Sequence, residues 1–213
     1  MSRFDLVIFD CDGVLVDSER LVVRVEAEIL TGLGWPMTEA EVIERFVGRS
    51  ALYMQAEIER HLGRPIDWAR LFEARYLEVF ETDLVAVPGI VDALDAIAVP
   101  SCVASSGSHE RMRLTLGLTG LYDRFAGRIF SVDEVAHGKP APDVFCHAAR
   151  TMGVAAARCA VVEDSVSGVT AGLAAQMSVF AYAGGVTTAT ALSLEGAVVF
   201  EHMHQLPGLL ARD

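Results

Sequence analysis

Two acidic residues, separated by one position, stand where the first apolar run of the chain ends. The segment Leu6–Glu19 reads LVIFDCDGVLVDSE, so Asp10 and Asp12 follow the apolar run and Gly13 comes next. Two carboxylates this close repel each other and are costly to desolvate, so a cation must offset their charge. One could then attack as an ionised nucleophile while the other, protonated, donates to a leaving oxygen. The simpler alternative is structural, with Asp12 only forming a turn before Gly13.

Three later segments carry residues that could complete such a site. VASSG supplies Ser105 and Ser106, GKPAPD supplies Lys139, and VVEDSVSG supplies Glu163 and Asp164. Carboxylate oxygens suit Mg²⁺, whereas a serine hydroxyl, the backbone N–H of Ser106 and a helix N-terminus suit a phosphate. Lys139 could neutralise both a bound phosphate and a nearby carboxylate. The segments together predict a hard-cation site beside an anion site.

Each of these residues also has a simpler interpretation. Glu163 and Asp164 could be acids at the start of a helix, where negative charge is favourable. Ser105 could begin a turn, with Ser106 or Ser108 as the helix cap. A lysine taken alone is usually a solvated charge. The functional reading therefore depends on whether the fold brings the segments together.

The elements that must position these residues alternate along most of the chain. Helical patterns cover Ile90–Ala98, Glu110–Leu116 and Asp143–Met152. Strand-like apolar runs cover Leu6–Phe9, Ser101–Ser105, Arg128–Ser131, Ala160–Val162, Ser178–Tyr182 and Ala197–Phe200. This alternation predicts an α/β protein with a Rossmann-like, doubly wound parallel sheet. Such sheets bind ligands at the carboxyl ends of their strands, so we expect the polar residues that follow the strands to converge there.

The alternation fails between Glu19 and Asp83, where helical spacing is broken by glycine and proline into about four segments. We therefore predict a helical cap of residues 18–85, inserted into an α/β core of residues 1–17 and 86–213. The two connectors, near Val16–Ser18 and Thr82–Val87, would let the insert close over a site as a lid.

Composition limits the partners that the chain can have. Its 213 residues, 52% of them apolar, can bury a substantial core, and the net charge of −12 argues against nucleic acid and anionic membrane surfaces. The uncharged stretch between Asp164 and Glu195 could span a bilayer by length, but its glycines and polar residues favour a helix followed by a strand. The four cysteines show no paired spacing, which indicates reduced thiols. We expect a cytoplasmic monomer that binds neither nucleic acid nor membrane.

Four segments, FDCDGVLVDSE, VASSG, GKPAPDVF and VVEDSVSG, resemble in order and spacing the four signatures of the haloacid dehalogenase superfamily. The helical insert resembles the cap of its β-phosphoglucomutase-like phosphatase branch. The resemblance implies that Asp10 is the nucleophile, forming an aspartyl-phosphate, and that Asp12 is the acid and base. It further implies Mg²⁺ bound by Asp10, Asp164 and the backbone carbonyl of Asp12, with Glu163 as a direct or water-mediated ligand.

The same resemblance extends to substrate binding. Ser105 and Lys139 would hold the transferring phosphoryl group. Arg49, in the cap segment VGRS, stands where relatives contact the rest of the substrate. An exposed helical arginine is also a common partner for a nearby glutamate, so that reading of Arg49 stays open.

Differences from particular members of the superfamily limit the reactions that this chain is predicted to catalyse. Dehalogenases of this superfamily lack the second aspartate, which is present here as Asp12. Phosphonate-cleaving relatives use a cap lysine, and residues 19–85 contain no lysine. β-Phosphoglucomutases carry a histidine where this chain has Val22. The sequence thus predicts a Mg²⁺-dependent phosphatase acting on a small phosphorylated metabolite, a sugar phosphate or sugar-acid phosphate. A sugar phosphomutase is the alternative, and a non-catalytic sugar-phosphate-binding protein is a third hypothesis.

Overall fold

The structure, a computed structural model, describes residues 3–211. Within it the chain forms two compact units. One comprises the chain up to Asp17 and from Val85 onward, and the other comprises Ser18–Leu84. Each unit is described by itself below, beginning with the one that carries the sheet.

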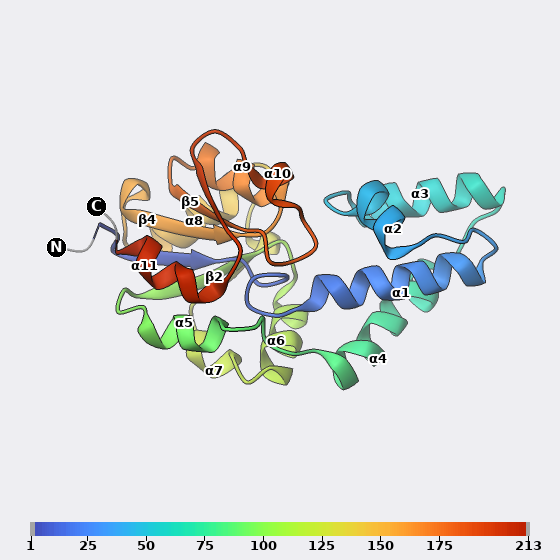
Figure 1. The fold of residues 1–213 in the computed structure, drawn as a ribbon, viewed down its shortest axis with the longest axis horizontal. Coiled ribbons are helices and arrows are strands. Elements are labelled where there is room, and N and C mark those ends of the chain that lie inside the picture. The colour runs from blue at the N-terminus through green and yellow to red at the C-terminus, as the bar shows by residue number, and fades with distance from the viewer. Residues whose placement is uncertain (1–2, 212–213) are drawn as a thin grey trace. The chain divides into compact units, whose positions relative to one another are not determined.

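The first unit is built on a six-stranded, all-parallel sheet in the order β3-β2-β1-β4-β5-β6 (Figure 1). The strands are β1 (Leu6–Phe9), β2 (Ser101–Ser105), β3 (Ile129–Ser131), β4 (Cys159–Glu163), β5 (Ser178–Tyr182) and β6 (Ala197–Phe200). Strand order reverses between β1 and β4, as in a doubly wound α/β fold. The predicted fold class is confirmed.

Helices cover both faces of this sheet (Figure 1). One layer contains α8 (Asp143–Thr151), α9 (Val166–Ala174) and α10 (Ala189–Leu192), and the other contains α5 (Ile90–Ala96), α6 (His109–Leu118), α7 (Tyr122–Phe125) and α11 (Leu206–Leu210). Neighbouring residues of β1 show why both are needed. Ile8 belongs to the buried cluster that includes Phe145 of α8, whereas the ring of Phe9 lies 6.3 Å from that of Phe125 in α7. Strands buried on both faces are apolar throughout.

Three short 3₁₀ turns complete the first unit: η2 (Val132–Glu134), η3 (Ala156–Arg158) and η4 (Met203–Gln205). The uncharged segment that follows Asp164 folds into α9, β5 and α10. Among the described residues, no helix is long and apolar enough to cross a membrane. The predicted helix of this segment, α9, starts at Val166 because the Ser165 hydroxyl caps it by accepting from the Gly168 N–H at 3.0 Å.

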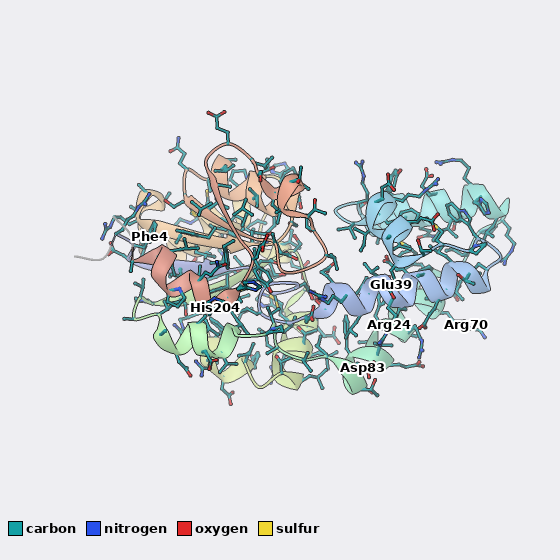
Figure 2. All side chains as sticks on the ribbon, in the orientation of Figure 1. Phe4, Arg24, Glu39, Arg70, Asp83 and His204 are labelled. Atoms are coloured by element: carbon teal, nitrogen blue, oxygen red, sulfur yellow. The ribbon has the colours of Figure 1, made fainter. Side chains whose placement is uncertain are left out.

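The second unit is helical. It contains α1 (Ser18–Gly32), α2 (Glu39–Phe46), α3 (Ala51–Leu62) and a π-helical turn, η1 (Ala69–Glu73), which runs directly into α4 (Ala74–Asp83). An ion pair of 2.5 Å between Arg24 and Asp83 joins α1 to α4 (Figure 2). Trp35 stacks on His61 with ring centroids 4.1 Å apart, so this indole packs inside the helical unit.

The chain leaves and re-enters the first unit at neighbouring positions. The Asp17 N–H donates to the Val85 carbonyl at 2.9 Å, and an isolated antiparallel bridge pairs Val16 with Ala86. The helical unit is therefore an insertion that starts and ends at one point of the sheet-bearing unit.

Candidate active site

The parallel register brings three predicted site residues to one edge of the sheet. Phe9, the last residue of β1, is level with Val103 of β2 on one side and Val162 of β4 on the other. Asp10, Ser105 and Glu163 therefore lie at the carboxyl ends of three adjacent strands. This edge is where the strand order reverses, the usual place for a ligand site in an open α/β sheet.

Lys139 reaches this edge from the loop before α8. Its Nζ donates to Asp10 Oδ1 at 2.6 Å, to Glu163 Oε1 at 2.7 Å and to the Ala104 carbonyl at 3.1 Å. These bonds use all three ammonium hydrogens, and the side chain is 3% exposed. Lys139 is also the single lysine of the chain. The solvated alternative for this residue is therefore wrong.

The pKa values at this cluster follow from burial and charge. Burial acts to lower the pKa of Lys139, but the carboxylates of Asp10 and Glu163 outweigh it and hold this pKa above its usual range. Burial raises the pKa of Asp10; the Lys139 ammonium opposes the shift and the Glu163 carboxylate adds to it, with a raised net pKa. One ammonium thus faces more negative charge than it can neutralise.

A third carboxylate completes a group that could hold a metal ion. Asp10, Glu163 and Asp164 are all buried, and one ligand oxygen from each lies within 4.8 Å of the others. Gly13 makes room for this group. A Cβ there would lie 2.0 Å from Asp164 Oδ2, and φ of +77° is a conformation that other residues rarely adopt. Buried, crowded carboxylate oxygens fit a hard divalent cation such as Mg²⁺.

Both oxygens of Glu163 already accept hydrogen bonds. Oε1 accepts from Lys139, while Oε2 accepts from the N–H of Asp164 and of Ser165, each at 3.0 Å, and from the Ser165 hydroxyl at 2.9 Å. A glycine on α9 accommodates this carboxylate, because a Cβ on Gly168 would lie 1.8 Å from Glu163 Cδ. The first turn of α9 thus fixes Glu163 in one orientation.

Asp12 lies beside this group, with a different partner. Its carboxylate is not part of the metal-binding group found among residues 3–211, and its Oδ1 accepts from Arg111 Nη2 at 3.3 Å. A Cβ on Gly107 would lie 3.7 Å from Asp12 Oδ2 and 3.5 Å from Ser105 Oγ, so these two side chains border the same glycine. The site thus joins the turn after β1 to the turn after β2.

The three serines of the β2–α6 turn differ in burial and in their hydrogen bonds. Ser105 is buried, and its hydroxyl accepts from the Gly107 N–H at 3.0 Å. Ser106 is exposed. Ser108 is the helix cap, accepting from the Arg111 N–H at 3.2 Å, which decides between the two capping alternatives.

Arg49 belongs to the helical unit, in the exposed loop between α2 and α3, and its guanidinium lies 5.6 Å from the ring centroid of Tyr53. The structure therefore brings Asp10, Asp12, Ser105, Lys139, Glu163 and Asp164 to one end of the sheet. Arg49 belongs to the other unit, and its role stays a prediction.

Three contributors to this site were not predicted from the sequence: Arg111, Gly168 and the loop after β5. A Cβ on Gly185, in that loop, would lie 3.6 Å from Asp164 Oδ2. A sequence signal existed for this loop, since the pair Gly184-Gly185 lies one residue beyond a predicted strand. Arg111 gave none, because its contact depends on the rotation of α6 about its own axis.

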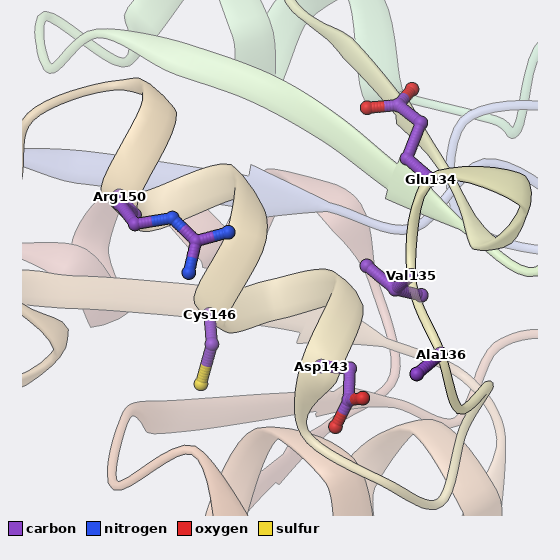
Figure 3. Close-up of a pocket in the computed structure, with 6 residues that line it drawn as sticks. All are labelled: Glu134, Val135, Ala136, Asp143, Cys146 and Arg150. Carbon is purple, nitrogen blue, oxygen red and sulfur yellow. The ribbon is translucent and has the colours of Figure 1, made fainter.

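A separate cavity of about 330 Å³ lies beside the loop that carries Lys139 (Figure 3). Its lining comes from η2, the following residues and α8, and consists of Glu134, Val135, Ala136, Asp143, Cys146 and Arg150. Near it, the Glu134 carboxylate pairs with the imidazoles of His109 and His147. None of the residues predicted to do chemistry lines this cavity, so it is distinct from the sheet-edge site.

Comparisons with known proteins agree with this geometry. The model of the haloacid dehalogenase-like hydrolases matches residues 4–176. The chain is 31% identical over 212 residues to 6-phosphogluconate phosphatase of Escherichia coli, covering 98% of this chain and 96% of that protein. A haloacid dehalogenase-like protein of unknown function from Agrobacterium tumefaciens has a TM-score of 0.89 at 36% identity, with 98% of each chain covered. A family hydrolase from Deinococcus radiodurans, solved with bound phosphate and sodium, has a TM-score of 0.85 at 31% identity, covering 99% of this chain and 96% of that one.

Proposed function

Because the chain belongs to the haloacid dehalogenase-like hydrolases and is a phosphoric monoester hydrolase, we propose that it cleaves a small phosphorylated sugar or sugar acid through an aspartyl-phosphate on Asp10. The observation that carries this proposal is the buried cluster of Asp10, Lys139, Glu163 and Asp164, with Asp12 beside it.

In the first half-reaction, an Asp10 oxygen forms a bond to phosphorus while the bond from phosphorus to the ester oxygen breaks. Asp12 gives its proton to that departing oxygen. In the second half-reaction, Asp12 takes a proton from a water that attacks the phosphorus, which releases inorganic phosphate and restores Asp10. Ser105 and the Ser106 N–H hold the phosphoryl oxygens. Lys139 helps to hold them through its positive charge, while its hydrogen bond fixes Asp10 Oδ1.

The donor set suits Mg²⁺, which Asp10, Asp164 and the backbone carbonyl of Asp12 would bind. When bound, the ion supplies positive charge that offsets the carboxylates and stabilises charge on the transferring oxygens. Because both oxygens of Glu163 accept hydrogen bonds, we assign this residue to orienting Lys139 and to water-mediated contact with the ion.

The substrate class follows from the relatives and from Asp12. A sugar alkoxide is a poor leaving group, so its departure needs the proton that Asp12 supplies. 6-Phosphogluconate phosphatase, to which this chain is similar over almost its full length, acts on a sugar-acid phosphate by its name. We propose that Ser18–Leu84 acts as a cap and that Arg49 contacts the sugar part of the substrate.

The decisive experiment is Asp10→Asn. We expect no phosphate release from any of a panel of sugar and sugar-acid phosphates, with circular dichroism and thermal unfolding showing a folded protein. Wild-type activity should disappear with a chelator and return with Mg²⁺. Turnover by a folded Asp10→Asn protein would refute the nucleophile assignment, whereas activity unaffected by chelation would refute the metal alone.

A mutase is the alternative that Val22 disfavours, because relatives of that kind carry a histidine there. The two reactions differ in the fate of the phosphoryl group. Isomer formation, measured against free phosphate from the same sugar phosphate, separates them. We expect phosphate to account for all of the substrate consumed.

A further inference from the structure

We propose that Arg111 is a positioning residue for Asp12, holding Oδ1 so that Oδ2 is the oxygen that exchanges a proton with the leaving group and with water. The inference rests on the acid–base role proposed above for Asp12. It adds to that role the residue on α6 that orients the carboxyl group.

One face of α6 contacts the turn after β1. Arg111 and Thr115 are four residues apart and therefore lie on the same side of this helix. Arg111 Nη2 lies 3.3 Å from Asp12 Oδ1, and the Thr115 hydroxyl lies 3.9 Å from the Cys11 thiol. Two successive residues of the β1 turn thus contact two successive turns of α6.

The path of the arginine side chain is also defined. A Cβ on Gly107 would lie 3.7 Å from Arg111 Cδ and 3.7 Å from Asp12 Oδ2, so the arginine stem and the aspartate border the same glycine. The Asp12 side chain is 17% exposed and that of Arg111 is 35% exposed. The contact is therefore partly shielded from water, which strengthens it over a surface pair.

A guanidinium suits this task because its hold does not depend on the proton that Asp12 transfers. It is a donor that stays charged, and it can donate to a carboxylate oxygen or to the carbonyl oxygen of a protonated carboxyl group. Because Oδ1 accepts from Arg111 in both the ionised and the protonated form of Asp12, rotation of the carboxyl group is restricted. The proton is then carried by Oδ2. Misplacing such a group by a small distance is costly in rate.

The test compares two leaving groups. Nitrophenolate departs from p-nitrophenyl phosphate as a stable anion without a proton, whereas a sugar alkoxide requires one. For Arg111→Ala, we expect kcat/KM to fall about tenfold or more on glucose 6-phosphate or 6-phosphogluconate, whichever the wild type hydrolyses faster, because a general acid contributes roughly 10²–10⁴-fold. On p-nitrophenyl phosphate the same variant should stay within about threefold of wild type.

The variant Asp12→Asn distinguishes the acid role of Asp12 from the positioning role of Arg111. It should show the same selectivity in kcat/KM as Arg111→Ala, to a larger extent, because kcat/KM reports the transfer to Asp10 and not the later hydrolysis in which Asp12 acts as base. If Asp12→Asn is selective and Arg111→Ala loses equally on both substrates, the positioning role is overturned and the function stands. If Asp12→Asn itself loses equally on both substrates, Asp12 is not the acid, and both the proposed role and this inference are overturned.

Two further variants guard against a folding defect. Arg111→Lys keeps a cationic donor on a similar stem, so it should recover part of the sugar-phosphate rate, and a recovery absent in a folded Arg111→Lys would count against the proposal. The matched control is Arg113→Ala on the same helix, an exposed arginine whose guanidinium lies 5.4 Å from the Tyr122 ring centroid. It should change neither substrate's kcat/KM.

Discussion

At the scale of single residues, the site is organised around one buried ammonium. Lys139 donates all three of its hydrogens, to two carboxylates and a strand carbonyl, at distances of 2.6–3.1 Å. Its charge is also 4.8 Å from the Phe145 ring centroid. Removing one partner of a buried ionic group leaves the others without compensation, which is more costly than the group's net contribution.

Lys139→Met tests that reasoning. It should lower the free energy of unfolding by about 3–5 kcal/mol, measured by urea denaturation in the presence of a chelator, because Asp10 and Glu163 would be left buried without their cation. The matched control is Arg158→Met. That change removes an exposed pair with Asp5, at 2.8 Å, and should have little effect. Similar losses in the two variants would contradict the role assigned to Lys139.

At the scale of elements, the strands position the acids and α9 secures one of them. Gly168 lies in the first turn of α9, and any side chain there would overlap Glu163. Gly117 also lies in a helix, α6, but apart from the adjacent residues and the backbone of its own helix no atom lies within 4 Å of a Cβ built on it. Replacement by alanine can therefore be compared at a crowded helical glycine, Gly168, and at an uncrowded one, Gly117.

We expect Gly168→Ala to destabilise the protein by about 1–3 kcal/mol through overpacking, and to reduce phosphate release because Glu163 must move away from Lys139. Gly117→Ala should instead stabilise it by about 0.5–1 kcal/mol, the ordinary gain of alanine over glycine inside a helix. Thermal and urea unfolding measure both. A neutral Gly168→Ala would mean that Glu163 relocates at no cost.

A buried carboxylate in the helical unit gives a pH-dependent prediction. Glu26 of α1 is 8% exposed; burial raises its pKa to about 7, although the Tyr76 hydroxyl, which donates to it at 2.8 Å, acts in the opposite direction. Because the folded state keeps the proton to higher pH than the unfolded state, stability is lost as pH rises from about 4.5 to about 7.

Glu26→Gln removes this titration. Relative to wild type, the variant should gain stability as pH rises, by up to about 3 kcal/mol well above pH 7, since each pKa unit corresponds to about 1.4 kcal/mol. Urea unfolding at about pH 5 and about pH 8.5 measures the difference. Glu28→Gln, a more exposed carboxylate on the same helix, is the control. An equal response in both variants would exclude Glu26 as its source.

The sequence predicted the elements better than the contacts between them. The bounds of β1, β2, β5 and β6 were predicted without error, because each is an apolar run ended by polar or glycine-bearing residues. The π-helical turn Ala69–Glu73 was not predicted, since its spacing there resembles that of an α-helix. Arg111 and Gly168 were missed for a related reason. Their importance depends on how α6 and α9 are rotated against the sheet, which a one-dimensional pattern does not specify.

At the scale of the whole molecule, the helical insertion and the sheet-bearing part form two compact units. The Asp17–Val85 hydrogen bond and the Val16–Ala86 bridge join the two ends of the insertion within the sheet-bearing unit. Domain insertion is best tolerated where the two ends of the inserted segment are close. The helical unit can therefore vary in sequence and length while the strand ends that hold the acids keep their register.

The burial of Lys139 also determines how this protein responds to amine chemistry. The chain has 17 lysines and arginines, and all of them except Lys139 are arginines. Reagents that acylate or reductively methylate ε-amines find their single target inside the cluster, so crosslinking and immobilisation through surface lysines will fail. For the same reason, any methylated-lysine signal in an NMR spectrum belongs to Lys139 and reports on the site.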